Sequence, residues 1–159
     1  MSRKTQKQSQ QARDVALSYF AALRAHDLDA AVARWLPGGV DRLVGQDELV
    51  APDGIYAFFN ELFAAFPDFV MDVVETVESP NRCTVRWRAE ATFSGPGAYQ
   101  GIQPNGARVE FEGCDVVEVK DGLIVANSAY IDGASVARQL GVMPPQGSKQ
   151  EERLLGLHG

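Results

Sequence analysis

The spacing of apolar residues changes near residue 69, and this change constrains the fold more than any other feature of the sequence. Before it, apolar residues recur at intervals of three and four, which is typical of amphipathic helices. The longest such set is Ile55, Phe58, Phe59, Leu62, Phe63 and Phe66. After it, apolar and polar residues alternate, which is typical of strands with one buried face. Helices followed by a run of strands predict an α+β fold.

Three helices are predicted before the strands. The first covers about residues 11–25 and follows a polar, Gln-rich lead of residues 1–10, which we expect to be frayed. Asp27 is an expected N-cap for a second, short helix, in which Trp35 faces inward. The Pro37-Gly38-Gly39 run is expected to end that helix.

The third helix is predicted to start at Asp53 and to end before Pro67. A short strand over residues 40–44 and a polar loop over residues 45–52 are expected to separate it from the second helix.

Four strands are predicted over residues 69–78, 83–93, 108–120 and 123–131. Asp121-Gly122 is typical of a two-residue hairpin turn, whereas the connection over residues 94–107 is longer and rich in Gly and Pro. A last short helix is expected over residues 134–140, followed by an extension over residues 143–159. The sequence therefore predicts a single domain over residues 11–142, in which a curved sheet and the helices enclose a cavity.

The alternation also predicts which side chains face the core. From Cys83 to Phe93 every odd position is apolar and every even one is polar, so the odd face is the buried one. In the next strand the odd positions again carry apolar side chains, except at Asp115, which shares the buried face with Phe111 and Val117. A carboxylate on a core face is unfavourable unless it is hydrogen-bonded or protonated. Asp115 is therefore either a pocket carboxyl with a raised pKa or a group that a backbone amide, an arginine or a bulge at Gly113 accommodates.

Two further polar residues lie near the end of the last strand. Asp132 is either an N-cap for the final helix or a carboxylate at the cavity. Asn127 has the parity that would direct its side chain into the same space, where it would orient a carbonyl group or serve as an ordinary core amide.

Composition excludes several classes of function. The net charge of −6 and the scattered basic residues argue against nucleic acid or an anionic membrane as partner. Two cysteines and two histidines without characteristic spacing argue against a structural zinc site, so no metal is expected. No apolar stretch follows the basic N-terminus, and from this we expect a cytoplasmic protein.

Several motifs together resemble a known family. They are Phe66-Pro67-Asp68, Val85-Arg86-Trp87 leading to Thr92-Phe93-Ser94-Gly95, the stretch from Gly101 to Phe111, Asp121-Gly122-Leu123-Ile124-Val125, Asp132, and Gln139-Leu140-Gly141. Their order and spacing are similar to those of the SnoaL-like polyketide cyclases, or ester cyclases, of the nuclear-transport-factor-2-like superfamily. The resemblance covers roughly residues 12–142.

The resemblance implies a cone-shaped fold, in which a bent antiparallel sheet carries three N-terminal helices over its concave face. It also implies a homodimer formed through the sheet and cofactor-free aldol cyclisation with an Asp as general acid/base. Family members often carry histidines where this sequence has Arg42, Phe93 and Asn127. These departures leave the reaction open, since one fold supports many activities.

The first hypothesis is a cofactor-free acid/base enzyme acting on a hydrophobic, polyketide-like carbonyl compound. Its candidate residues are Asp132 or Asp115 as the acid/base, Asn127, Tyr19 and Arg42 as orienting groups, and Trp87, Phe59, Phe63 and Phe93 as walls. The alternatives are an epoxide hydrolase, dehydratase or isomerase on the same scaffold, and a non-catalytic small-molecule-binding dimer.

Overall fold

The structure is a computed structural model that describes residues 1–156, and its elements follow the predicted change from helices to strands. In chain order they are α1 Arg3–Arg24, α2 Leu28–Val32, β1 Trp35–Leu43, β2 Asp47–Val50, α3 Asp53–Ala65, β3 Val70–Ser79, β4 Arg82–Thr92, β5 Arg108–Lys120, β6 Leu123–Ile131, α4 Gly133–Gln139 and α5 Lys149–Leu154. The predicted α+β class is confirmed. The short helix expected over residues 134–140 is α4, and a fifth helix, α5, follows it.

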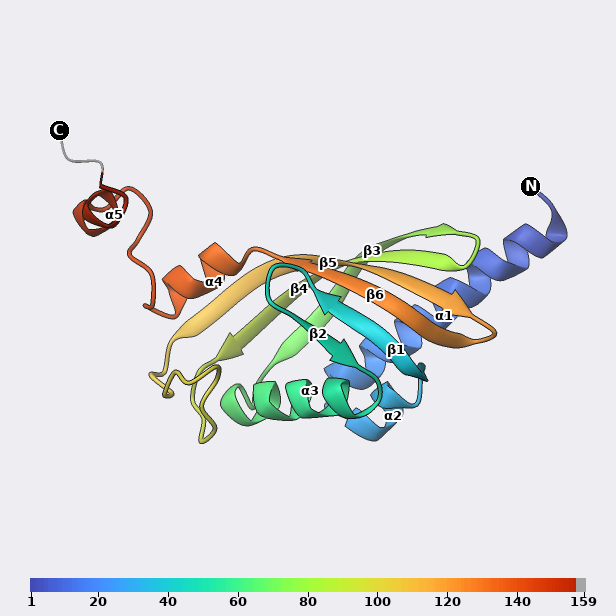
Figure 1. The fold of residues 1–159 in the computed structure, drawn as a ribbon, viewed down its shortest axis with the longest axis horizontal. Coiled ribbons are helices and arrows are strands. Elements are labelled where there is room, and N and C mark those ends of the chain that lie inside the picture. Colours follow the sequence, from blue (N-terminus) through green and yellow to red (C-terminus); the bar gives the residue numbers. More distant parts are fainter. Residues whose placement is uncertain (157–159) are drawn as a thin grey trace.

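One bent sheet, with strand order β2-β1-β6-β5-β4-β3, carries α1, α2 and α3 on one side (Figure 1). Neighbouring strands are antiparallel except β1 and β6, which are parallel. The expected antiparallel sheet therefore contains one parallel pair. A parallel pair needs a long crossover between its strands, and α3 with β3–β5 provides it.

The first helix begins earlier than predicted. It starts at Arg3 rather than near residue 11, because the Ser2 hydroxyl accepts a hydrogen bond from the Thr5 amide and caps the helix. The expected frayed lead of residues 1–10 is thus mostly helical. At the other end of the chain, α5 lies within the expected extension of residues 143–159, whose last residues, 157–159, lie outside the described part.

The segment between the second and third helices was predicted only in part: the short strand expected over residues 40–44 is the end of β1, but the residues on either side of it differ from the prediction. Trp35 is buried as expected, but it starts strand β1, which continues through the Pro37-Gly38-Gly39 run. The expected loop over residues 45–52 contains strand β2, which pairs with β1. Pairing of Trp35 with Ile124 in β6 stabilises an extended chain here, and this long-range contact outweighs the local preference for a helix.

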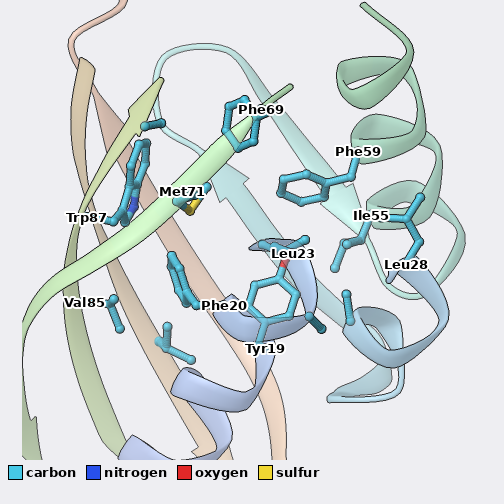
Figure 2. Packing of buried hydrophobic residues seen from close by; sticks show 14 of the residues in the cluster. Tyr19, Phe20, Leu23, Leu28, Ile55, Phe59, Phe69, Met71, Val85 and Trp87 are labelled. Atoms are coloured by element: carbon cyan, nitrogen blue, oxygen red, sulfur yellow. The ribbon is translucent and has the colours of Figure 1, made fainter. Parts of the chain in front are cut away.

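The predicted strand faces are confirmed. Cys83, Val85, Trp87, Ala89 and Ala91 of β4 are all buried, and the odd positions of β5 face the same core. Figure 2 shows how side chains of α1, α3 and the sheet meet in this core.

The opposite face of the sheet is charged and exposed. Arg86 lies 2.8 Å from Glu75, and Arg108 lies 2.8 Å from Glu90. Exposed pairs of this kind contribute little to stability. A homodimer formed through this face stays a prediction.

Candidate functional site

A cavity lies between the sheet and the helices α1 and α3. It contains about 660 Å³ of empty space when its open mouth is counted. Aromatic and aliphatic side chains form most of its walls, including Phe58, Phe59 and Leu62 of α3. Phe58 and Leu62 belong to the periodic apolar set of this helix but are only half-buried, because they face this open space rather than solid core.

Two carboxyl groups line this apolar cavity. Asp41 of β1 is 2% exposed and Asp115 of β5 is 7% exposed. Asn127 of β6, the strand between them, donates hydrogen bonds from Nδ2 to Asp41 Oδ1 at 3.0 Å and to Asp115 Oδ2 at 2.7 Å. No lysine, arginine or histidine lines the cavity in the part of the chain that the structure describes. The two carboxyls therefore share an amide bridge and have no cation beside them.

Trp87 of β4 completes the hydrogen bonding of Asp115. Its indole Nε1 donates to Asp115 Oδ1 at 2.8 Å. The ring reaches the carboxyl because Gly113 lies opposite Trp87 in the β4–β5 pairing and has no side chain. A Cβ at position 113 would overlap the indole. Gly113 thus makes room for the ring that holds Asp115.

Burial shifts the proton equilibria of both carboxyls. Burial and the neighbouring Asp115 raise the pKa of Asp41 to about 7, although the hydrogen bond from Asn127 lowers it in part. Burial also raises the pKa of Asp115 to about 6, although the hydrogen bonds from Trp87 and Asn127 lower it in part. Near neutral pH each group is therefore poised to take up or release a proton.

We expect Asp41→Asn to stabilise the fold at pH 8. A carboxyl with a raised pKa binds its proton more tightly in the folded state, so stability is lost as pH rises from about 4 to about 7. One pKa unit corresponds to about 1.4 kcal/mol, which gives a penalty of roughly 4 kcal/mol for a rise from 3.8 to about 7. Urea unfolding should show the variant more stable than wild type at pH 8 and nearly equal at pH 4. Equal stability at both pH values would contradict the burial of an ionisable Asp41.

The structure brings together five of the candidate residues predicted from sequence. Asp115, Trp87, Tyr19 and Phe59 line the cavity, and Asn127 contacts Asp115 as its parity suggested. The hydrogen bonds to Asp115 come from two side chains, and neither a backbone amide nor an arginine donates to it. Asp115 also faces the core, so the alternative of a bulge at Gly113 that turns it outward is not what the structure shows.

Asp132 lies outside the cavity. Its carboxylate is exposed and accepts a hydrogen bond from the Ser135 amide at 3.0 Å, so it caps α4. The chain turns from β6 into α4 at this point, and the preceding residue, Ile131, is the last of the strand to line the cavity. The helix-capping alternative for Asp132 is thus the one that the structure bears out.

Three other candidates also face elsewhere. Arg42 lies on the exposed side of β1, where it donates to Ser128 and Tyr130. Phe93 is fully buried, but it stacks on Phe66 beyond the end of β4. Phe63 stacks on the His26 ring at a centroid distance of 3.8 Å. None of these three lines the cavity, because each side chain already packs in another direction.

Asp41 is the site residue that sequence reasoning missed. The available signal was parity, since Asp41 shares the odd face of β1 with Leu43, which also lines the cavity. That signal was weak because Val40 and Leu43 leave the alternation of this short segment ambiguous. The partner of Asp41, Asn127, is 86 residues away in the chain.

Over residues 1–156 no group of three or more His, Cys, Asp or Glu side chains could hold a metal ion. In the same range no helix is long and apolar enough to cross a bilayer.

Residues 13–140 of the chain match the sequence pattern of the SnoaL-like polyketide cyclases. The chain belongs to this family. The match spans most of the sequence and includes every strand of the sheet. No relative is found among the curated proteins.

Solved structures with the same fold differ in their described activities. AclR of Streptomyces galilaeus, a candidate hydroxylase, is 24% identical with a TM-score of 0.75, over 86% of this chain and 99% of that one. IdmH of Streptomyces antibioticus, a candidate polyketide cyclase, is 25% identical with a TM-score of 0.68, over 82% and 98%. An LEH-like epoxide hydrolase of M. tuberculosis is 19% identical with a TM-score of 0.67, over 83% and 86%. The fold alone therefore does not select the reaction.

At three positions this SnoaL-like chain differs from the residues often found in its family. Only one of these positions lies in the site. Asn127 bridges the two carboxyls, whereas Arg42 is exposed and Phe93 packs in the core. The two buried carboxyl groups at the cavity are thus those of Asp41 and Asp115.

Proposed function

We propose that the protein is a cofactor-free acid/base enzyme that acts on a hydrophobic carbonyl compound, with Asp115 as the acid/base. The supporting observation is a buried carboxyl in an aromatic cavity, held by Trp87 and Asn127 and with its pKa raised to about 6. A carboxylate with a pKa near the working pH is suited to proton transfer. The apolar walls favour a substrate that is largely hydrocarbon.

In this proposal the ionised Asp115 removes a proton from the carbon next to a carbonyl group. The C–H electron pair moves into the enolate, and the negative charge develops on the carbonyl oxygen. In a cyclisation, the enolate carbon attacks a second carbonyl carbon of the same molecule and forms a C–C bond. The proton held by Asp115 then passes to the resulting alkoxide, so that the carboxylate is regenerated.

Proton exchange on a simple ketone tests this proposal without knowledge of the natural substrate. 2-Tetralone is apolar and bicyclic and has acidic protons beside its carbonyl group. In D₂O, NMR should show faster deuterium incorporation with the protein than with buffer alone. The rate should increase as pH rises through about 6, because Asp115 must be ionised to act as the base. Exchange no faster than in buffer at any pH would contradict the proposal.

The second carboxyl favours one alternative, epoxide hydrolysis. Here the ionised Asp115 would take a proton from water, and the water oxygen would attack an epoxide carbon. As the C–O bond breaks, the protonated Asp41 would donate its proton to the leaving oxygen, and the product is a diol. Burial and the neighbouring Asp115 raise the pKa of Asp41, which suits Asp41 to the acid role.

Styrene oxide in ¹⁸O-labelled water distinguishes this alternative from the cyclase. An epoxide hydrolase should form a diol with one labelled oxygen faster than buffer does. Its pH profile should be bell-shaped between about 6 and about 7, since one carboxyl must be ionised and the other protonated. A diol rate equal to that of buffer would remove this alternative.

A further inference from the structure

Tyr19 has a polar group that the fold itself does not use. The residue lies on α1, is 1% exposed and lines the same cavity as Asp41 and Asp115. Its hydroxyl has no hydrogen-bond partner among residues 1–156. Buried hydroxyl groups are nearly always paired, because an unpaired one is unfavourable. A hydroxyl that is buried and unpaired in a cavity is therefore available to a ligand.

The position of this hydroxyl is well defined. The Tyr19 ring meets Phe20 and Trp35 edge to face, each at a centroid distance of 5.8 Å. Figure 2 shows the ring extending from α1 with its oxygen directed into the interior of the cluster. The indole N–H of Trp35 can only donate, so it leaves the Tyr19 proton available.

The hydroxyl is also a donor rather than a base at neutral pH. Burial and the neighbouring Asp41 and Asp115 raise the pKa of Tyr19 well above its ordinary value, and the nearby indole N–H of Trp35 lowers it only in part. Neither carboxyl accepts a hydrogen bond from it, since the bonds that they receive from side chains come from Asn127 and Trp87. The cavity thus holds two acidic groups and, on Tyr19, a buried neutral donor that neither of them engages.

We propose that Tyr19 is a specificity residue whose hydroxyl donates a hydrogen bond to an oxygen atom of the ligand. The ligand class is an aromatic or polycyclic ketone, enol or phenol, with that oxygen in the buried polar part of the cavity. The inference rests on the proposed function in one respect: the bound oxygen would be the one on which enolate charge develops when Asp115 removes the proton. Tyr19 would then also stabilise that charge.

Two probes of similar shape test the proposal by calorimetry at pH 7. 2-Naphthol carries a hydroxyl where 2-methylnaphthalene carries a methyl group. Wild type should bind 2-naphthol more tightly, although the methyl compound is the more hydrophobic of the two. Tyr19→Phe should weaken 2-naphthol binding roughly 3- to 10-fold, as expected for one lost hydrogen bond, and leave 2-methylnaphthalene binding unchanged.

Tyr130→Phe is the matched control. Tyr130 of β6 is exposed, its hydroxyl accepts a hydrogen bond from Arg42, and it does not line the cavity. This variant should bind both probes as wild type does. Thermal unfolding should show Tyr19→Phe folded, because the change keeps the ring and removes only an unpaired group.

The outcomes separate this inference from the proposed function. Equal weakening of both probes in Tyr19→Phe, or no weakening, would overturn the role of Tyr19. So would a wild-type protein that binds the two probes equally or binds neither. If the probes are discriminated through Tyr19 but 2-tetralone exchange stays at the buffer rate, the inference holds and the enzyme proposal fails.

Discussion

Replacing Asp115 with Asn is expected to lower the rate of 2-tetralone exchange by 10²- to 10⁴-fold. This is the usual contribution of a positioned acid/base group. The amide keeps the shape of the side chain and an oxygen that can accept from Trp87 Nε1, but it cannot take up a proton at neutral pH. Rates measured by NMR at pH 7 on the variant and wild type test this directly.

Asp132→Asn is the control for this prediction. Asp132 was an equal candidate on sequence grounds, but it is exposed and caps α4. Asn is also a good N-cap, so this variant should keep both stability and rate. A loss of rate in Asp132→Asn that matches the loss in Asp115→Asn would contradict the assignment of the site to the cavity.

Replacing Gly113 with Ala is expected to destabilise the fold by about 3 kcal/mol, at the upper end of the range for overpacked cores. From propensity alone the opposite is expected, because Ala is favoured over Gly within a strand by less than about 1 kcal/mol. The overlap of the new Cβ with the Trp87 indole outweighs this gain. For a chain of this size the melting temperature should fall by roughly 6–12 °C.

The same change should also reduce activity. A displaced indole no longer donates to Asp115, so the buried carboxylate loses one of its two side-chain donors. The activity profile should then shift to higher pH, since ionisation becomes less favourable.

Gly133→Ala and a double mutant complete the test of Gly113. A Cβ at Gly133 meets no atom within 4 Å, so that variant should melt within about 2 °C of wild type. Combining Gly113→Ala with Trp87→Phe should cost less than the sum of the two single changes, because the smaller ring leaves room for the methyl group. Additive losses, or a stable Gly113→Ala, would contradict the close approach of residue 113 and the indole.

Local patterns determined much of this architecture. The strands β3 to β6 were predicted because alternation of apolar and polar residues over a long segment fits a half-buried strand and does not fit a helix. The hairpin at Asp121-Gly122 was predicted for a similar reason, and both residues have positive φ, as such a turn requires. Alternation also identified Asp115 as a buried carboxyl, since an acidic residue on an apolar face is conspicuous in sequence.

Local patterns failed where distant segments decide the structure. Strand β1 forms because it pairs with β6, and no short-range signal reports that contact. Asp41 joins the site through the same pairing, which sets Asp41 opposite Asn127.

Sequence patterns were enough to identify the α+β class, the buried faces of β4 and β5, the family, and Asp115 and Asn127 as side chains directed into one space. Only the tertiary structure showed that Asp41 is the second carboxyl, that Asp132 caps a helix, and that Gly113 admits the ring of Trp87. The two kinds of signal differ in their range along the chain. Periodicity reports which side of an element is buried, whereas the neighbours of a buried group are set by strand register and packing between segments far apart in the chain.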